Sequence, residues 1–220
     1  MHIPTLDTRE IPLFEGIAQE ERDAMLNCLE AYTRHYRAGE FIVVDQDTVR
    51  HVGLVLGGRV HMLKEDRAGH KTLLACLEPG EMFGDAIALR RSPLAEVSFS
   101  AAVNTEILFL SMEHILEPCK NNCVFHRRLV VNTFRQLGEE YRRLLEKIEI
   151  STKASLREKI LAYLRLLSER QGRKYITCPL TRTEMAAYLE SNRSAMTREL
   201  ASMRAAGLID FDRNTFVLKE

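Results

Sequence analysis

The feature that most constrains the fold is a long stretch, from about residue 122 to residue 150, in which apolar residues recur at helical spacing. It contains no proline, and its one glycine is Gly138. The apolar positions follow one another at steps of 4, 3, 4, 3 and 4: Val130, Phe134, Leu137, Tyr141, Leu144 and Ile148. This is the heptad pattern by which two helices bury a shared apolar stripe. The sequence therefore predicts one helix roughly 40 Å long, at about 1.5 Å per residue.

Such a helix can bury its apolar stripe in two ways. It can pack against its own domain, or it can pair with a second copy across a two-fold axis. A helix of this length has too little of its own domain to lie on, so we expect a homodimer in which these six residues form the seam. Gly138 lowers the helix propensity by about 1 kcal/mol, and it either permits a close approach or marks a flexible point.

Short strands are expected ahead of this helix, between about residues 34 and 111. Runs of β-branched and aliphatic residues alternate with Gly and Pro, which is typical of an antiparallel sandwich or barrel. The predicted strands are Phe41–Val44, Val52–Leu56, Arg59–Leu63, Thr72–Leu77, Val97–Ala101 and Glu106–Leu110. The Gly57-Gly58 pair suits a hairpin turn because glycine accepts positive φ. A short amphipathic helix is expected over residues 17–29.

The residues after this helix follow the pattern of a winged helix-turn-helix. A helix is expected over residues 155–168, followed by an edge strand over residues 175–180. Thr181 is a good N-cap, and Glu184 completes a capping box. A short second helix would follow, and Asn192 can cap a third. Two short strands, residues 208–211 and 215–218, would then pair as the wing.

The third of these helices carries the candidate DNA-reading face. Met196, Leu200 and Met203 would point inward, so that small polar residues and arginines lie on the opposite side. Arginine can bond guanine O6 and N7, and Ser or Thr can bond bases or phosphates in a major groove. The exposed face would hold Arg193, Ser194, Thr197 and Arg198.

Charge separates the two halves of the chain. Residues 151–220 hold 13 basic and 8 acidic residues, whereas residues 1–150 hold 18 basic and 23 acidic ones. A basic C-terminal part fits nucleic-acid binding.

No apolar run approaches the roughly 18–20 residues that span a membrane, and no signal peptide is visible. The five cysteines form no regular framework, which suits a reducing cytoplasm.

In the order of these parts the chain resembles the Crp/Fnr family, the group of the cyclic-AMP receptor protein and the fumarate-nitrate regulator. Residues 80–85 (GEMFGD) resemble the family's Gly-Asp-x-Phe-Gly-Glu turn. Residues 180–186 (LTRTEMA) resemble its first helix-turn-helix helix, and residues 192–200 (NRSAMTREL) resemble its recognition helix. The ending Gly207-Leu208-Ile209 matches as well. The similarity extends over nearly the whole chain.

The resemblance implies an α+β fold in three parts: an N-terminal antiparallel β-barrel (a cyclic-nucleotide-binding-like jelly roll), a long dimerisation helix and a C-terminal winged helix-turn-helix. The corresponding segments are 1–118, 119–150 and 151–220. Its function would be sequence-specific binding of double-stranded promoter DNA as a homodimer, with half-sites about 34–36 Å apart. RNA polymerase is the expected partner of the bound regulator. The candidate DNA-binding residues are Thr181, Arg182, Thr183, Asn192, Arg193, Ser194, Thr197 and Arg198.

The effector pocket departs from the pattern of the family's cyclic-nucleotide binders. Those proteins place an Arg-Ser pair after the glycine turn to hold the phosphate, but this chain has Ala95-Glu96 there. A carboxylate repels a phosphate, and the arginine fork is missing; the turn acid is also shortened to Asp85. Cyclic AMP is therefore not the expected ligand. The candidate pocket residues are Phe83, Gly84, Asp85, Ala86, Ala95 and Glu96.

The recognition helix also departs from the family pattern. Ser194 stands where the family has a base-reading Glu, which indicates a different operator sequence.

A different signal could act through Cys119, Cys123 and His126. On a helix these three residues would share one face, and thiolate and imidazole are ligands for zinc, iron or haem, while paired thiols can sense redox change. The other interpretation is two small buried cysteines and a histidine that pack on the barrel. The N-terminal cysteine cluster of the family's iron–sulfur members is absent, and no haem-ligand motif is present, so the cofactor stays unidentified.

Two other classes of function are weighed against a DNA-binding regulator. In the first, the C-terminal part docks a protein instead of DNA, and the arginine-bearing face argues against it. In the second, the barrel is an enzyme like the cupins, whose metal site needs a His-x-His pair. The sequence contains no such pair, so we expect no enzyme.

Overall fold

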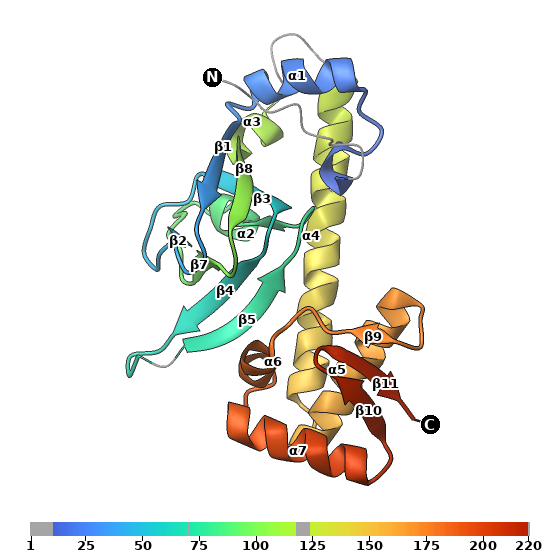
Figure 1. The fold of residues 1–220 in the computed structure, drawn as a ribbon. Coiled ribbons are helices and arrows are strands. Elements are labelled where there is room, and N and C mark those ends of the chain that lie inside the picture. Colours follow the sequence, from blue (N-terminus) through green and yellow to red (C-terminus); the bar gives the residue numbers. More distant parts are fainter. Residues whose placement is uncertain (1–10, 70, 118–123, 220) are drawn as a thin grey trace. The chain divides into compact units, whose positions relative to one another are not determined.

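The computed structural model describes residues 11–69, 71–117 and 124–219. The described residues fall into two compact units, divided between Tyr141 and Arg142. One long helix, α4 (Val124–Ser151), contributes its first part to the first unit and its last part to the second (Figure 1). No helix in the described ranges has the length and apolarity that a membrane crossing requires.

The first unit contains two four-stranded antiparallel sheets. One has the order β1-β8-β3-β6, formed by Tyr32–Tyr36, Thr105–Ser111, His51–Gly57 and Met82–Phe83. The other has the order β2-β7-β4-β5, formed by Phe41–Val43, Ser98–Ala101, Val60–Glu65 and Lys71–Leu77. The predicted antiparallel jelly roll is confirmed, although the described strand pairs do not close the two sheets into a barrel.

Two hydrophobic clusters stabilise this unit. The aromatic-rich cluster draws on both sheets and consists of Val55, Val60, Leu77, Phe83, Phe99, Ile107 and Phe109. The other is formed by β3, β8, the N-terminal helix α1 (Gln19–Cys28), α3 (Met112–Leu116), the short 3-10 turn Pro12–Phe14 and Leu129 of α4. The helix predicted over residues 17–29 is thus present as α1, which is slightly shorter than predicted. A one-turn helix, α2 (Asp85–Ala88), and α3 were not predicted from the sequence.

The helix α4 packs on the first unit through a face that differs from its heptad seam. Leu129, Asn132, Thr133 and Gln136 are buried. Asn132 Nδ2 donates to the backbone oxygens of Leu13 at 3.0 Å and Glu15 at 2.9 Å, which accounts for a buried amide. The seam residues Phe134, Tyr141, Leu144 and Ile148 are exposed in the single chain, whereas Val130 and Leu137 are half-buried.

The second unit has the predicted winged helix-turn-helix order. Its helices are α5 (Leu156–Gln171), α6 (Arg182–Tyr188) and α7 (Arg193–Ala205), and its sheet has the order β10-β11-β9, formed by Ile209–Asp212, Thr215–Leu218 and Ile176–Thr177. Ser155 caps α5 in a capping box with Glu158, and Gly172 ends it in the left-handed region at φ +59°. The edge strand predicted over residues 175–180 spans only Ile176–Thr177, because Pro179 has no backbone N–H for a ladder.

Candidate nucleic-acid interface

Local capping positions the two helices of the helix-turn-helix. The backbone N–H of Thr181 donates to the Glu184 carboxylate at 2.6 Å, and Thr181 Oγ1 accepts from the Glu184 N–H at 3.3 Å. Asn192 Oδ1 accepts from the N–H of Ala195 at 2.8 Å. Both caps satisfy N–H groups that a helix start leaves unpaired. The predicted starts of α6 and α7 are therefore confirmed.

Buried apolar residues hold these helices on α5. Met185, Ala186 and Leu189 of the α6 region are buried, as are Met196, Leu200 and Met203 of α7. Ile160 and Leu164 of α5 are fully buried as well. The inward set predicted for α7 is thus correct, and its opposite face must point to solvent.

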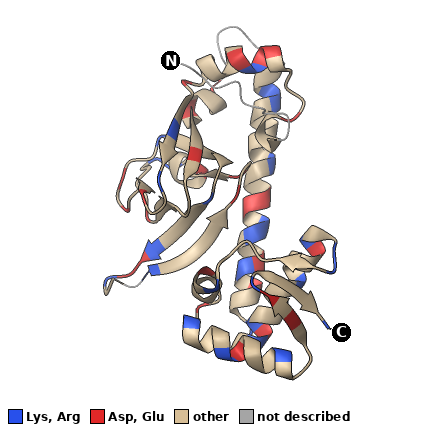
Figure 2. Ribbon diagram, viewed as in Figure 1, with Lys and Arg blue, Asp and Glu red and all other residues tan. Residues whose placement is uncertain are grey.

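That solvent-facing side of α7 carries the arginines predicted to read DNA. Arg193, Ser194, Thr197 and Arg198 are all exposed. Thr197 Oγ1 donates to the backbone oxygen of Arg193 at 2.8 Å, which fixes its hydroxyl on this face. In the part of the chain that the structure describes, no hydrogen bond or ion pair engages the guanidinium of Arg193 or Arg198. Basic residues recur along α7 in Figure 2. These groups can therefore bind an external acceptor.

The start of α6 holds the other predicted DNA-binding residues. Thr181 and Thr183 are exposed, whereas Arg182 is half-buried. The Arg182 guanidinium lies over the rings of Phe216 at 4.5 Å and Phe211 at 4.9 Å. It also donates to the backbone oxygen of Arg213 in the wing turn. Burial lowers the pKa of this guanidinium from its usual value. Arg182 therefore joins α6 to the wing, a role that the sequence did not indicate.

A second arginine supports the wing from α7. Arg204 Nε donates to Asp210 Oδ1 at 2.9 Å, and its guanidinium lies 4.1 Å from the centre of the Phe211 ring. Lys219 lies 3.3 Å from the same carboxylate. The hydrogen bond from Arg204 and then that from Lys219 lower the pKa of Asp210. Phe211 is thus in contact with two arginines, one from each helix of the motif.

The candidate effector residues lie on and beside α2 and β7. Phe83 is buried and its ring centre lies 4.8 Å from that of Phe99. Gly84 has φ +79° and is the N-cap of α2. Asp85 is buried, and its Oδ1 has no hydrogen-bond partner among the described residues. Ala95 is fully buried, and Ala86 is exposed.

Glu96, at the position where the resemblance predicts repulsion of a phosphate, is exposed and paired. Arg90 donates to Glu96 Oε1 at 2.9 Å. This hydrogen bond and the charge of Arg90 lower the pKa of Glu96, so the side chain is a carboxylate at neutral pH. Lys64 also donates to the Glu96 backbone oxygen. The Arg90 guanidinium is therefore already engaged by this carboxylate.

The predicted sensor cluster is only partly visible. Cys119 and Cys123 lie outside the described residues. His126 lies in α4, half-buried, and its Nε2 has no hydrogen-bond partner in the described part of the chain. Within the same part, no three His, Cys, Asp or Glu side chains are grouped as a metal site would require. Of the other cysteines, Cys178 is buried and Cys76 is half-buried.

Comparison with known proteins gives matches to both units. Residues 33–122 match the model of the cyclic nucleotide-binding domain, and residues 158–220 match that of the Crp-like helix-turn-helix domain. The cyclic AMP receptor protein of Thermus thermophilus is 27% identical over 95% of this chain and 93% of its own length. The transcriptional activator protein FnrL of Cereibacter sphaeroides is 21% identical over 85% of this chain and 76% of its own.

A solved structure with a similar fold is that of the c-di-GMP responsive global regulator CLP of Xanthomonas campestris. It superposes with a TM-score of 0.72 and 18% identity, covering 91% of this chain and 99% of that one. At this identity the match concerns the fold, and the fold agrees with the jelly roll, long helix and winged helix-turn-helix described above.

Proposed function

Because the chain belongs to the Crp/Fnr family of transcription regulators, we propose that it binds promoter DNA as a homodimer and reads the sequence with α7. The observation that carries this proposal is the exposed face of α7, where two arginines without a partner in the described chain flank Ser194 and Thr197. Arg193 and Arg198 would bond base edges or phosphates, and Ser194 and Thr197 would contact bases. The segments 1–118, 119–150 and 151–220 would act as sensor, dimerisation helix and DNA-binding domain.

The other candidate residues would serve this face indirectly or at its edge. Thr181 and Thr183 are exposed at the start of α6 and would contact phosphates. Asn192 would act as the cap that fixes the first turn of α7. Arg182 would hold the wing rather than bond a base, because its guanidinium is already packed on two rings. RNA polymerase remains a proposed partner of the bound regulator.

Homodimer formation is supported by the exposed seam of α4. Phe134, Tyr141 and Ile148 are 63%, 65% and 58% exposed in the single chain, although other residues of the same helix are buried. Burying large apolar side chains of this kind contributes roughly 1.5–3 kcal/mol each. A second α4 would cover them and place two copies of α7 about one turn of DNA apart.

The signal that controls the regulator would be something other than cyclic AMP. The name of the Thermus relative states that it is a receptor for that nucleotide. In this chain a cyclic phosphate would face the Glu96 carboxylate, whose neighbour Arg90 is already bonded to it. We propose a small molecule of different charge, and the second candidate is redox or metal chemistry at Cys119, Cys123 and His126.

Charge reversal on α7 tests the proposed function. Promoter fragments selected by the full-length protein from random double-stranded DNA would be titrated with wild type and with Arg198→Glu in a gel shift. Loss of one base or phosphate contact and addition of a repulsive charge should weaken binding at least about tenfold. Lys174→Glu makes the same change of charge at an exposed site away from α7 and should bind nearly as wild type. Equal binding by all three proteins, or capture of no DNA, would favour docking to a protein instead.

A further inference from the structure

The turn between α6 and α7 contains an unusual residue for its backbone conformation. Glu190 has φ +56°, in the left-handed region that glycine tolerates and other L residues rarely adopt. It follows Leu189, the C-cap of α6, and Arg193 starts α7. A glycine would adopt this conformation without strain, whereas the Glu190 side chain can offset the strain through contacts of its own.

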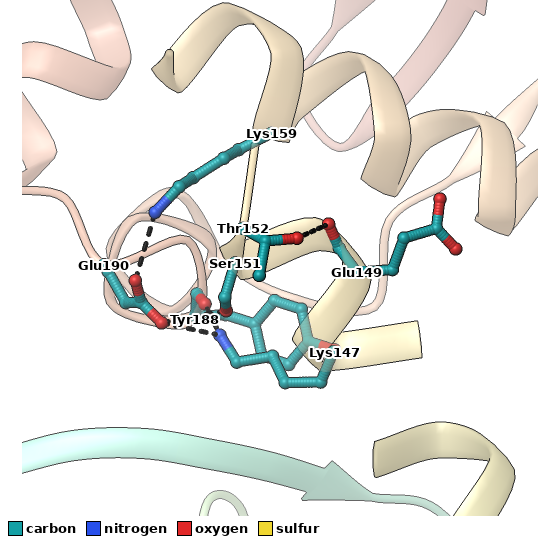
Figure 3. Close-up of polar contacts among 7 residues, drawn as sticks. All are labelled: Lys147, Glu149, Ser151, Thr152, Lys159, Tyr188 and Glu190. Carbon is teal, nitrogen blue, oxygen red and sulfur yellow. Dashed lines mark hydrogen bonds and ion pairs between the residues drawn. The ribbon is translucent and has the colours of Figure 1, made fainter. Parts of the chain in front are cut away.

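Those contacts connect the turn to two other elements of the second unit (Figure 3). Ser151 Oγ, at the end of α4, donates to Glu190 Oε1 at 2.8 Å. Lys159 Nζ, on α5, donates to Oε2 at 3.0 Å. Lys147 Nζ, one turn before Ser151 on α4, lies 3.8 Å from Oε1. One carboxylate therefore ties together the end of α4, the start of α5 and the turn before α7.

Both lysines in this group are largely buried, although the carboxylate that they share is partly open to solvent. The side chains of Lys147 and Lys159 are 12% and 16% exposed, and that of Glu190 is 44% exposed. Lys147 lies 4.1 Å from the centre of the Tyr188 ring and donates to the Tyr188 backbone oxygen. Burial lowers the pKa of Lys147, and the hydrogen bonds from Lys159 and Ser151 lower the pKa of Glu190. Glu190 thus compensates for two partly desolvated ammonium groups.

We propose that Glu190 is a positioning residue that fixes the recognition helix to the end of the dimer helix, so that α7 keeps a defined orientation relative to α4. The proposal rests on the proposed function, since it assumes that two copies of α7 read DNA across a dimer formed by α4. The Glu190 cluster, which comprises Lys147, Ser151, Lys159, Tyr188 and Glu190, transmits the direction of α4 to the turn that begins α7. Without it, α7 keeps its fold but varies in angle.

The variants Glu190→Gly and Glu190→Gln test this proposal in the full-length protein. Glycine keeps the left-handed backbone and removes the carboxylate, while glutamine keeps the shape and removes the charge. Glu169→Gln is the matched control, because it neutralises an exposed glutamate of α5 in the same unit. Each protein would be titrated with the operator that wild type selects from random DNA, and with versions that carry one or two base pairs more or fewer between the half-sites.

We expect Glu190→Gly and Glu190→Gln to bind the selected operator about tenfold more weakly, the factor that corresponds to one lost charge-assisted hydrogen bond. We also expect them to tolerate altered half-site spacing better than wild type and Glu169→Gln. A purely stabilising role would lower the melting temperature but leave the preference for spacing unchanged, so that result would overturn the proposal. Unchanged affinity and spacing would overturn it as well. Failure of wild type to select any DNA would instead refute the proposed function.

Discussion

At the scale of single residues, the contact between Gly53 and Phe83 fixes the turn that carries the candidate effector residues. The two residues are partners in the β3–β6 pair. A Cβ added at Gly53 would lie 2.2 Å from the Phe83 ring, so only glycine leaves room for this ring in its present position. Phe83 in turn packs on Phe99 and Phe109, with ring centres at 4.8 and 6.5 Å. Gly84 and Asp85 follow Phe83 directly in the chain, so the position of the Phe83 ring determines where their backbone lies.

We therefore predict that Gly53→Ala destabilises the first unit. Forcing the Phe83 ring to move in a packed core should cost about 1–3 kcal/mol of unfolding free energy, which urea denaturation measures. Gly57→Ala is the control, since it lies on the same strand and a Cβ there has no neighbour within 4 Å. An equal loss of stability in the two variants would contradict this prediction.

At the scale of elements, the start of α7 depends on one side chain. Asn192 adopts extended backbone angles, and its Oδ1 accepts from Ala195 N. Because α7 has no acidic residue in its first turn, this cap is its main local stabilisation at the N-terminus. The first turn contains Arg193 and Ser194, so fraying there would directly disturb the proposed reading face.

Replacing this cap should therefore weaken both folding and DNA binding. Asn192→Ala should cost about 1 kcal/mol of unfolding free energy, while Asn192→Asp keeps an acceptor and adds a charge that favours a helix start. Thermal unfolding followed by circular dichroism compares the two variants, and a gel shift compares their affinity for DNA. Identical melting temperatures for the alanine and aspartate variants would show that the cap contributes nothing.

The elements that local sequence determines were predicted well. Thr181 with Glu184 and Asn192 with Ala195 interact over three residues, so the caps of α6 and α7 follow from spacing alone. Long-range contacts were not predictable in this way. Glu190 meets Ser151 39 positions earlier, and Arg182 meets Arg213 31 positions later. The order of strands in the two sheets depends on pairings of the same non-local kind, and it was not predicted from the sequence.

At the scale of the whole molecule, the two faces of α4 have different environments. Its buried face is polar at Asn132 and Gln136 and hydrogen-bonds the loops of its own unit. Its seam is apolar, and four of its six residues are exposed in the single chain. The face that donates hydrogen bonds to its own unit is not available to a partner. An exposed apolar stripe at heptad spacing can pack against a second helix. We therefore expect α4 to pair two chains through its exposed stripe, while its first part stays packed on the first unit.

If the exposed face of α4 forms the dimer seam, introducing one charged side chain there should separate the subunits. Tyr141→Glu would place carboxylates from both chains in the apolar interface, where burial of an unpaired charge is costly. We expect a monomer in sedimentation velocity and binding only to single half-sites, with affinity for the two-half-site operator reduced at least about a hundredfold through the loss of avidity. Tyr175→Glu is the control, because Tyr175 is a tyrosine with the same 65% exposure on the second unit. A Tyr141→Glu protein that sediments as a dimer would place the subunit contact elsewhere on the chain.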